Sequence, residues 1–231
     1  MLKSVSFDAA RTLFYAEDFR PNWKLLSEYL IRQGLELYPQ ELEAARNYVF
    51  MVDLPRMHID NWYDWCAQIL VRLDHPNIPP EIIPGMIEIL QPVTENYKLY
   101  DDVIEFFSGI NELGLTYSIV TTIPEFKLQP VLSEIRSNFI QITHGGNAGC
   151  VKGNPKMYWL DLKEKDVLPD ENIFVGDNPY LDIEIPKMMG QQTVHIDREH
   201  QQVLRNSRAD FTITSFHQLS QILQQLVDHE D

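Results

Sequence analysis

Short apolar runs alternate with helix-period segments from Lys98 onward, and this alternation constrains the fold more than any other feature of the sequence. Apolar runs rich in β-branched and aromatic residues predict strands. Strands that alternate with helices indicate βαβ units and a parallel sheet covered on both faces. We therefore predict an α/β fold with a Rossmann-like, doubly wound parallel sheet. Its strands are expected at residues 3–7, 117–120, 139–142, 172–175, 193–196 and 211–214, and its helices at 102–113, 128–136, 155–165, 180–189 and 216–227.

Residues 15–96 have a different character, because they show helical periodicity without a convincing alternating strand. Proline-rich joints, such as the one at 75–80, separate the helical runs. We predict an all-helical domain at 15–96, inserted after the first strand of an α/β core domain that comprises 1–14 and 97–231. The helical runs of the insert are expected at 22–32, 40–51, 60–73 and 81–90.

Composition excludes several classes of protein. The 34 Asp and Glu residues outnumber the 19 Lys and Arg residues, and the net charge of −15 would repel the phosphate backbone of a nucleic acid. No stretch approaches the roughly 18 apolar residues of a membrane span, and Asp8 comes too early for the apolar region of a signal peptide. Two cysteines cannot build a disulfide framework. We expect a cytoplasmic protein without a nucleic-acid or membrane partner, and leave its oligomeric state open.

Polar side chains stand where three of the predicted strands end. Asp8, Thr121 and Asp177 each follow such a strand, and Lys152 lies in a loop before a predicted helix. Ligands of open α/β sheets bind outside the carboxyl ends of the strands. The sequence therefore predicts one rim that carries a carboxylate able to act as a nucleophile, a hydroxyl, a cation and a second carboxylate.

Four segments around these residues resemble the motifs of the haloacid dehalogenase superfamily of hydrolases. They occur in the order of that family, each at the strand or loop position that the family requires. The predicted α/β core resembles the core of the family, and the helical insert resembles its C1-type cap domain. The four segments are Ser6-Phe7-Asp8-Ala9-Ala10-Arg11-Thr12-Leu13-Phe14, Ser118-Ile119-Val120-Thr121-Thr122, Val151-Lys152-Gly153-Asn154-Pro155 and Phe174-Val175-Gly176-Asp177-Asn178-Pro179-Tyr180-Leu181-Asp182.

The resemblance implies a phosphatase that works through an aspartyl-phosphate. Asp8 would attack the phosphoryl group, and water would then hydrolyse the covalent intermediate. The implied cofactor is Mg²⁺, which prefers hard oxygen ligands. By resemblance, the ligands are the carboxylates of Asp8 and Asp177 and the backbone carbonyl of Ala10, with Asp182 as a further ligand or an orienting residue.

The resemblance also assigns the residues that bind the phosphoryl group. Thr121 would donate a hydrogen bond to a phosphoryl oxygen, and Lys152 would neutralise the nucleophile and the transferring group. Thr122 and Arg11 are further candidates for substrate binding. The implied partner is a small phosphorylated metabolite.

Each of these residues also has a structural interpretation. Asp8 could cap a helix, and Thr121 could end a strand as an ordinary β-former. Lys152 could be a solvated loop lysine, and Asp177 could belong to a simple turn. Asp182 could favour a helix N-terminus through the macrodipole. The order of the four segments favours the functional interpretation for the set.

The sequence departs from the family at two positions next to the nucleophile. Phosphatases of the family usually carry an aspartate two residues after it as general acid and base, where this chain has Ala10. Loss of such help typically lowers the rate 10²–10⁴-fold. Dehalogenases proper lack the aspartate that this chain has as Asp177, which argues against dehalogenation. Phosphonate-cleaving members need a cap lysine. The sole lysine of the insert, Lys24, lies early in the first predicted helix, which argues against phosphonate cleavage. Arg11, in place of the usual glycine, could bind an anion or point to solvent.

Two classes of function stay open from the sequence. The first is a metal-dependent phosphatase, and the second is a weak or inactive relative that binds a phosphorylated ligand or a protein partner. A generic α/β domain with accidental motif matches is a third interpretation. The histidines without ligand spacing are predicted to be structural: His58, His144, His195 and His200. Candidates for specificity in the insert, none of them assigned as a site, are Arg20, Arg46, Arg56, Trp62 and Tyr63.

Overall fold

Six strands form one parallel sheet in the computed structural model, which describes the chain except residues 18–20, 74–78, 80, 110–112, 199–207 and 229–231. The strand order is β5-β4-β1-β6-β7-β8, and every neighbouring pair is parallel. The predicted doubly wound α/β fold is confirmed. The strands are β1 (Ser4–Phe7), β4 (Thr116–Val120), β5 (Gln141–Thr143), β6 (Asn172–Gly176), β7 (Gln192–Ile196) and β8 (Phe211–Ile213).

Helices cover both faces of this sheet because successive strand residues point to opposite faces. Helices α6, α7 and α11 contribute to the apolar cluster on one face, and α9 and α10 to the cluster on the other. The helices and single turns of this part are α6 (Asp101–Gly109), α7 (Glu125–Leu132), η3 (Arg136–Asn138), α8 (Gly145–Ala148), α9 (Pro155–Lys165), η4 (Pro169–Glu171), η5 (Pro179–Glu184), α10 (Ile185–Met188) and α11 (Phe216–Asp228).

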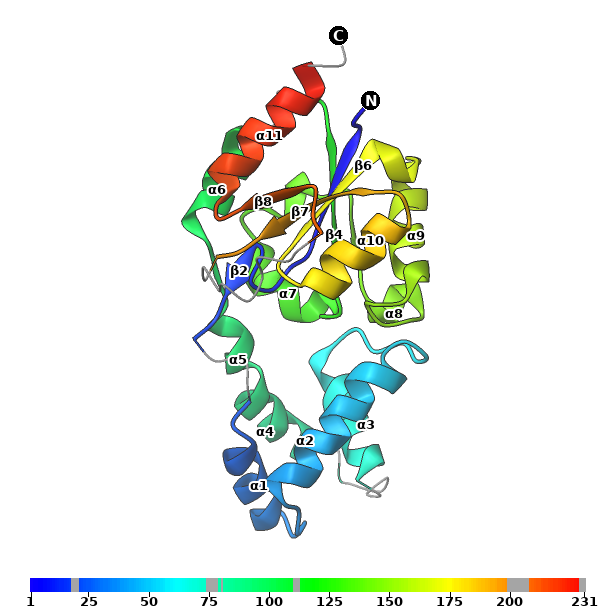
Figure 1. The fold of residues 1–231 in the computed structure, drawn as a ribbon. Coiled ribbons are helices and arrows are strands. Elements are labelled where there is room, and N and C mark those ends of the chain that lie inside the picture. Colours follow the sequence, from blue (N-terminus) through cyan, green and yellow to red (C-terminus); the bar gives the residue numbers. More distant parts are fainter. Residues whose placement is uncertain (18–20, 74–78, 80, 110–112, 199–207, 229–231) are drawn as a thin grey trace.

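A second group of helices packs around its own apolar cluster, below the sheet in Figure 1. A short antiparallel ladder, β2 (Phe14–Tyr15) with β3 (Lys98–Leu99), stands where the chain leaves and re-enters the sheet part. The predicted joint at 75–80, apart from Pro79, and the candidate Arg20 lie outside the described residues. The helices are α1 (Trp23–Arg32), α2 (Pro39–Tyr48), η1 (Val49–Asp53), α3 (Trp62–Arg72), α4 (Ile82–Leu90) and α5 (Pro92–Glu95).

Three local predictions were wrong. The ladder of β2 and β3 was missed, because a pair of two-residue strands gives no periodic signal. The strand predicted from residue 139 begins at Gln141, after the single turn η3. The helix predicted at 180–189 is a π-helical turn, η5, followed by the short α10. Such π-helical turns are frequent at functional sites.

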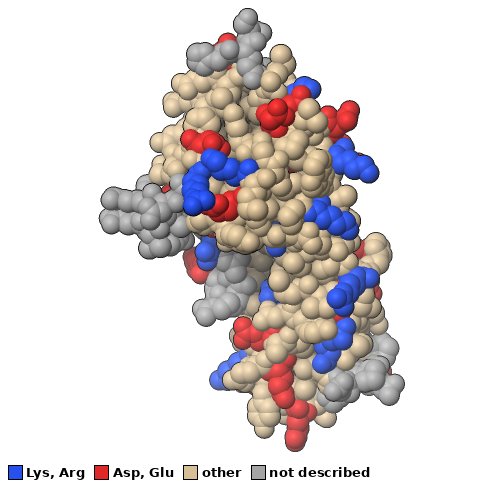
Figure 2. All heavy atoms as spheres, turned by 45° about the vertical axis from the view of Figure 1, so that its right-hand side comes forward, with Lys and Arg blue, Asp and Glu red and all other residues tan. Residues whose placement is uncertain are grey.

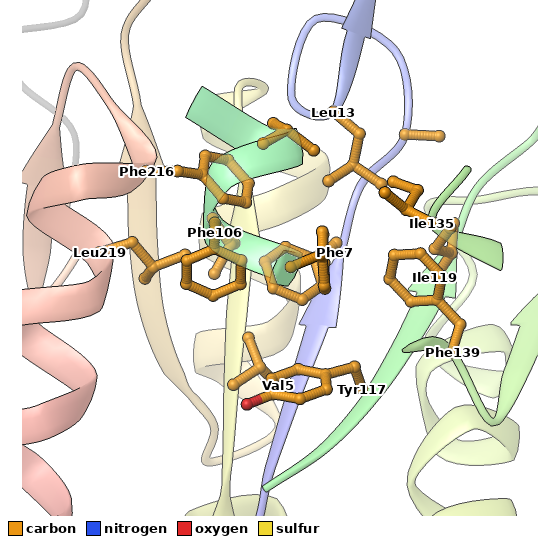
Figure 3. Packing of buried hydrophobic residues seen from close by; sticks show 14 of the residues in the cluster. Val5, Phe7, Leu13, Phe106, Tyr117, Ile119, Ile135, Phe139, Phe216 and Leu219 are labelled. Atoms are coloured by element: carbon orange, nitrogen blue, oxygen red, sulfur yellow. The ribbon is translucent and has the colours of Figure 1, made fainter. Parts of the chain in front are cut away.

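The core on one face of the sheet is built around Phe7, which is fully buried in β1. Its ring stacks on that of Phe216 at 5.6 Å and meets those of Phe107 and Phe139 edge-on at 5.6 and 6.2 Å. Figure 3 shows Phe7 at the centre of side chains from β1, β4, α6 and α11. This packing fixes β1, and therefore the residue that follows it.

Beneath the other face, a buried polar network ties β1 and β6 to α9. Lys165 forms an ion pair with Asp161 at 2.9 Å and donates hydrogen bonds to Ser6 and Asn172 at 2.6 and 2.8 Å. Ser6 donates in turn to Asp161 at 2.6 Å. The two charged side chains are almost fully buried, so each depends on the other for compensation.

The surface carries charges of both signs without a continuous basic region on the face that Figure 2 shows. Cys66 and Cys150 are both free thiols. No described helix is both long enough and apolar enough to cross a lipid bilayer.

Candidate active site

The predicted rim exists at the carboxyl ends of three adjacent strands. Asp8 follows β1, Thr121 follows β4 and Asp177 follows β6, and β1 lies between the other two strands in the sheet. The amide of Asp8 donates to the carbonyl of Val175, so the residue continues the strand pairing before the chain turns. Parallel strands that end together bring these side chains to one edge.

Lys152 joins two of the carboxylates. Its Nζ donates to Oδ1 of Asp8 and lies 2.7 Å from Oδ1 of Asp182. The Lys152 side chain is 3% exposed, which excludes the interpretation as a solvated loop lysine. Burial lowers the pKa of Lys152, but the carboxylates of Asp182 and Asp8 outweigh that effect and raise it above its ordinary value. Lys152 therefore stays protonated in this site.

Three carboxylates gather around this lysine. Oxygen atoms of Asp8, Asp177 and Asp182 all lie within 4.8 Å of one another. Burial raises the pKa of Asp177 to about 7, and the neighbouring charges of Asp8 and Asp182 add to the shift. Burial also raises the pKa of Asp182, although Lys152 opposes it. One ammonium does not compensate three carboxylates, so the cluster favours protons or a further cation.

The donor set fits a hard divalent metal ion. Carboxylate oxygens are the ligands that such ions prefer, and the three groups are close enough to share one ion. The ammonium of Lys152 already stands between two of them, which shows that this space accepts positive charge. The carbonyl of Ala10, the fourth predicted ligand, belongs to a half-buried residue of the turn after β1.

The sequence of the fourth quoted segment, residues 174–182, explains why Asp182 is buried. Asn178 accepts hydrogen bonds from the amides of Tyr180 and Leu181 and so starts the π-helical turn η5. This turn brings Oδ2 of Asp182 to the amide of Asn178 at 2.9 Å. A Cβ atom on Gly176 would lie 2.4 Å from the Asp182 carboxyl carbon, so any larger residue at 176 would displace the carboxylate.

Thr121 is 2% exposed at the end of β4, and its amide donates to Thr143 of the next strand. Its Oγ1 accepts a hydrogen bond of 3.2 Å from the amide of Ile123. That bond leaves the hydroxyl proton free to be donated to a ligand. Thr122 is half-buried beside it.

The turn after β1 carries both departures from the usual pattern. Arg11 adopts φ of 63°, in the left-handed region that favours glycine, and its amide donates to the carbonyl of Phe14 at 2.6 Å. Its side chain is exposed, yet close enough for its charge to lower the pKa of Asp177. Ala10 offers no group that could carry a proton.

Two supporting residues were not predicted from the sequence. Thr12, inside the first quoted segment, donates from Oγ1 to Oδ2 of Asp8 at 3.2 Å. Arg198 donates to the carbonyl of Thr12 at 3.0 Å and forms an ion pair with Asp102, also at 3.0 Å. The spacing of Thr12 and Asp8 could have indicated the first contact, whereas nothing local indicates Arg198. Of the histidines predicted to be structural, His195 lies against the carbonyl of Asp177 at 3.1 Å, and His200 is outside the described residues.

Comparison with known proteins gives matches over most of the chain. A family profile described as haloacid dehalogenase-like hydrolase matches residues 66–196. The chain is 34% identical to a glyceraldehyde 3-phosphate phosphatase of Pyrococcus furiosus, over 96% of this chain and 93% of that protein. It is 25% identical to a phosphoserine phosphatase of Thermus thermophilus over 52% of this chain, a match that spans only about half (49%) of that relative's length.

The fold has a close counterpart among solved structures. A 2-haloacid dehalogenase from Pseudomonas syringae superposes with a TM-score of 0.74 and 16% identity, over 98% of this chain and 100% of that one. At this level of identity, the likeness concerns the fold alone.

Proposed function

Because the chain belongs to the family of haloacid dehalogenase-like hydrolases, we propose that it is a Mg²⁺-dependent phosphatase of small phosphomonoesters with Asp8 as its nucleophile. The observation that carries the proposal is the joining of Asp8 and Asp182 by the buried Lys152, with Asp177 beside them. The relatives named phosphatases support the same class of reaction.

The charge of the site suits a phosphoryl group once a metal ion is present. When all three are ionised, Asp8, Asp177 and Asp182 carry three negative charges against the single charge of Lys152. Asp8, Asp177 and the Ala10 carbonyl would hold Mg²⁺, and the ion would supply charge neutralisation for an incoming phosphate. Asp182 then acts through Lys152 and the amide of Asn178 rather than on the substrate.

The residues of the chain have separate tasks in the proposed reaction. Asp8 attacks phosphorus and forms an aspartyl-phosphate while the leaving oxygen departs. Lys152 and Thr12 hold the two oxygens of Asp8, so that the carboxylate is oriented before the substrate arrives. Thr121 donates its hydroxyl proton to a phosphoryl oxygen, and Lys152 stabilises the negative charge of the transferring group.

Ala10 restricts which esters the site can cleave fast. No side chain at position 10 can protonate the leaving oxygen, so the first step depends on the leaving group being stable as an anion. Acyl phosphates and aryl phosphates meet that requirement better than alkyl phosphates do. We propose further that residues 15–96 act as a cap that excludes water while Asp8 reacts.

The test compares hydrolysis of p-nitrophenyl phosphate and acetyl phosphate with and without Mg²⁺. The variants are Asp8→Asn and, as a matched control, Asp170→Asn, which changes an exposed aspartate far from the rim in the fold. Metal-dependent turnover that only Asp8→Asn abolishes would support the proposal. Acid-quenched protein should also gain the mass of one phosphoryl group on the peptide that contains Asp8.

Two other results would redirect the assignment. Turnover retained in Asp8→Asn would contradict the aspartyl-phosphate mechanism. Mg²⁺ binding without turnover of either compound would favour the second function class, a weak or inactive relative that binds a phosphorylated ligand. Ala10, which cannot act as an acid, also favours that class.

A further inference from the structure

A cavity of about 160 Å³ lies where the cap helices meet the sheet part. Its walls come from α2 and α3, from the segment around Tyr97, and from α7. Figure 1 shows α7 on the side of the sheet part that faces the helical group. The residues that matter for its chemistry are Arg46, Trp62, Trp65, Tyr97, Ile123 and Lys127.

The cavity adjoins the proposed phosphoryl site. Ile123 lines the cavity, and its amide donates to Oγ1 of Thr121 at 3.2 Å. Tyr97 lines it from another side and stacks on Phe14 at 4.9 Å, and Phe14 pairs with Ala10 in the turn after the nucleophile. A ligand of a few bonds' length could therefore occupy both places.

Lys127 brings a cation into this cavity. Its side chain stands on the first turn of α7 and the residue is only 8% exposed. The Nζ lies 3.3 Å from the ring centre of Trp65 and 4.9 Å from that of Trp62. Within the described part of the chain, it has no ion pair and no hydrogen-bond acceptor. Burial, helped by the charge of Arg46, lowers the pKa of Lys127.

Arg46 brings a second cation to the same space. Its guanidinium lies over the ring of Phe50 at 4.8 Å and donates one hydrogen bond, of 2.8 Å, to the side chain of Asn47. No carboxylate of the described residues forms an ion pair with it. A guanidinium presents five donors in a fixed fork, so most of its donors stay available.

A buried cation and a half-buried cation side by side, neither with a carboxylate, are unfavourable in an aromatic cavity unless an anion joins them. Elsewhere in this protein, buried cations such as Lys152 and Lys165 have carboxylate partners within the chain. We propose that Arg46 and Lys127 bind a second anionic group of the substrate, so that the enzyme prefers phosphomonoesters that carry a carboxylate or second phosphate a few bonds from the reacting group. This inference rests on the proposed phosphatase function and adds the substrate class to it.

The first test uses substrates that differ only in this group. We compare kcat/KM for 3-phosphoglycerate, glycerol 3-phosphate and glycerol 1,3-bisphosphate, which end in a carboxylate, a hydroxymethyl group and a phosphorylated hydroxymethyl group, respectively. The wild type should prefer at least one anionic compound over glycerol 3-phosphate by about tenfold or more, the factor expected from one charge-assisted contact. The two anionic compounds then identify which group the cavity receives.

Variants link that preference to the cavity. Lys127→Met and Arg46→Met should each lower the preference at least about fivefold, which is the loss expected for about 1 kcal/mol of interaction. Lys163→Met and Arg32→Met, which change exposed residues remote from the cavity, should leave it unchanged. Equal use of the neutral and the anionic compounds by the wild type, or an unchanged preference in both cavity variants, would overturn the inference.

A binding measurement separates this inference from the proposed function. Trp62 and Trp65 line the cavity, so a bound ligand should change the tryptophan fluorescence. Glycerate should change the fluorescence of the wild type more than that of Lys127→Met, whereas glycerol should show no such difference. If no phosphate ester is hydrolysed but glycerate binds in this way, the phosphatase function fails and the anion site stands. If hydrolysis proceeds and neither preference nor glycerate binding is found, the anion site fails alone.

Discussion

Asp177→Asn should stabilise the metal-free protein and at the same time abolish its stabilisation by Mg²⁺. The pKa of Asp177 is raised from 3.8 to about 7 by burial and by the charges of Asp8 and Asp182. A group with a raised pKa binds its proton more tightly in the folded than in the unfolded protein. The stabilisation from this proton is therefore complete below the pKa of the group in the unfolded protein and is lost as the pH rises through its pKa in the folded protein.

The size of the effect follows from this shift. A change from 3.8 to about 7 corresponds to at most about 4 kcal/mol between the acid side and about pH 8. Asparagine carries no charge, so the variant does not lose this free energy of unfolding as the pH rises. In EDTA at about pH 8, the variant should be more stable than the wild type by up to about 4 kcal/mol, and the difference should nearly vanish at about pH 4.

Urea unfolding measures both parts of the prediction. In EDTA, the free energies of unfolding of the two proteins should converge toward acid pH. Mg²⁺ at about a hundred times its dissociation constant should stabilise the wild type by about 2.7 kcal/mol and leave Asp177→Asn nearly unchanged. A variant that is less stable than the wild type in EDTA at about pH 8 would refute the electrostatic reasoning. Asp170→Asn, at an exposed position, serves as the control.

Three further predictions concern other parts of the molecule. Ala10→Asp should raise kcat/KM for alkyl phosphates by about 10²-fold or more and change acetyl phosphate hydrolysis little, because only the former needs a proton donor; equal effects on both would show that the missing acid is not limiting. Lys127→Met should raise the free energy of unfolding at neutral pH, because burial lowers the pKa of Lys127 and so makes its charged form unfavourable in the native protein. The gain should shrink toward about pH 10, where the unfolded chain also loses the proton of this lysine. Asp161→Leu should lower the free energy of unfolding by about 3–5 kcal/mol, since Lys165 is left as an uncompensated buried charge. The double variant with Lys165→Met should recover most of the loss. Urea unfolding checks both stability predictions, and a double variant as unstable as Asp161→Leu would contradict the second.

The sequence predicts the parallel sheet and the rim because both depend on short-range features. A strand such as residues 172–175 is recognisable from its own apolar residues, and the residue that follows it must stand at the carboxyl end. The carboxyl ends of parallel strands share one edge, so Asp8, Thr121 and Asp177 could be placed together without knowledge of the tertiary structure. Lys152 was placed at the same rim by its position in the loop before a predicted helix, and the family motifs added Asp182.

Side-chain partners and the conformation of turns were beyond such reasoning. The contact of Lys152 with Asp182 depends on the π-helical turn η5, which the apolar pattern of 180–189 cannot distinguish from an ordinary helix. Arg198 reaches the turn after β1 across 186 residues of sequence, a contact with no local signal. Both arise from packing between elements that are distant along the chain.

The cavity shows most clearly which features the sequence predicts and which only the tertiary structure decides. The sequence indicated Arg46 and Trp62 as two of several candidates in the insert, and it gave no reason to select Lys127, a lysine of the α/β core. Only the packing of the helical group against the sheet part brings these residues around one space. Local periodicity determines which elements form and what stands at their ends, whereas the meeting of cations from separate elements is decided by how those elements pack in three dimensions.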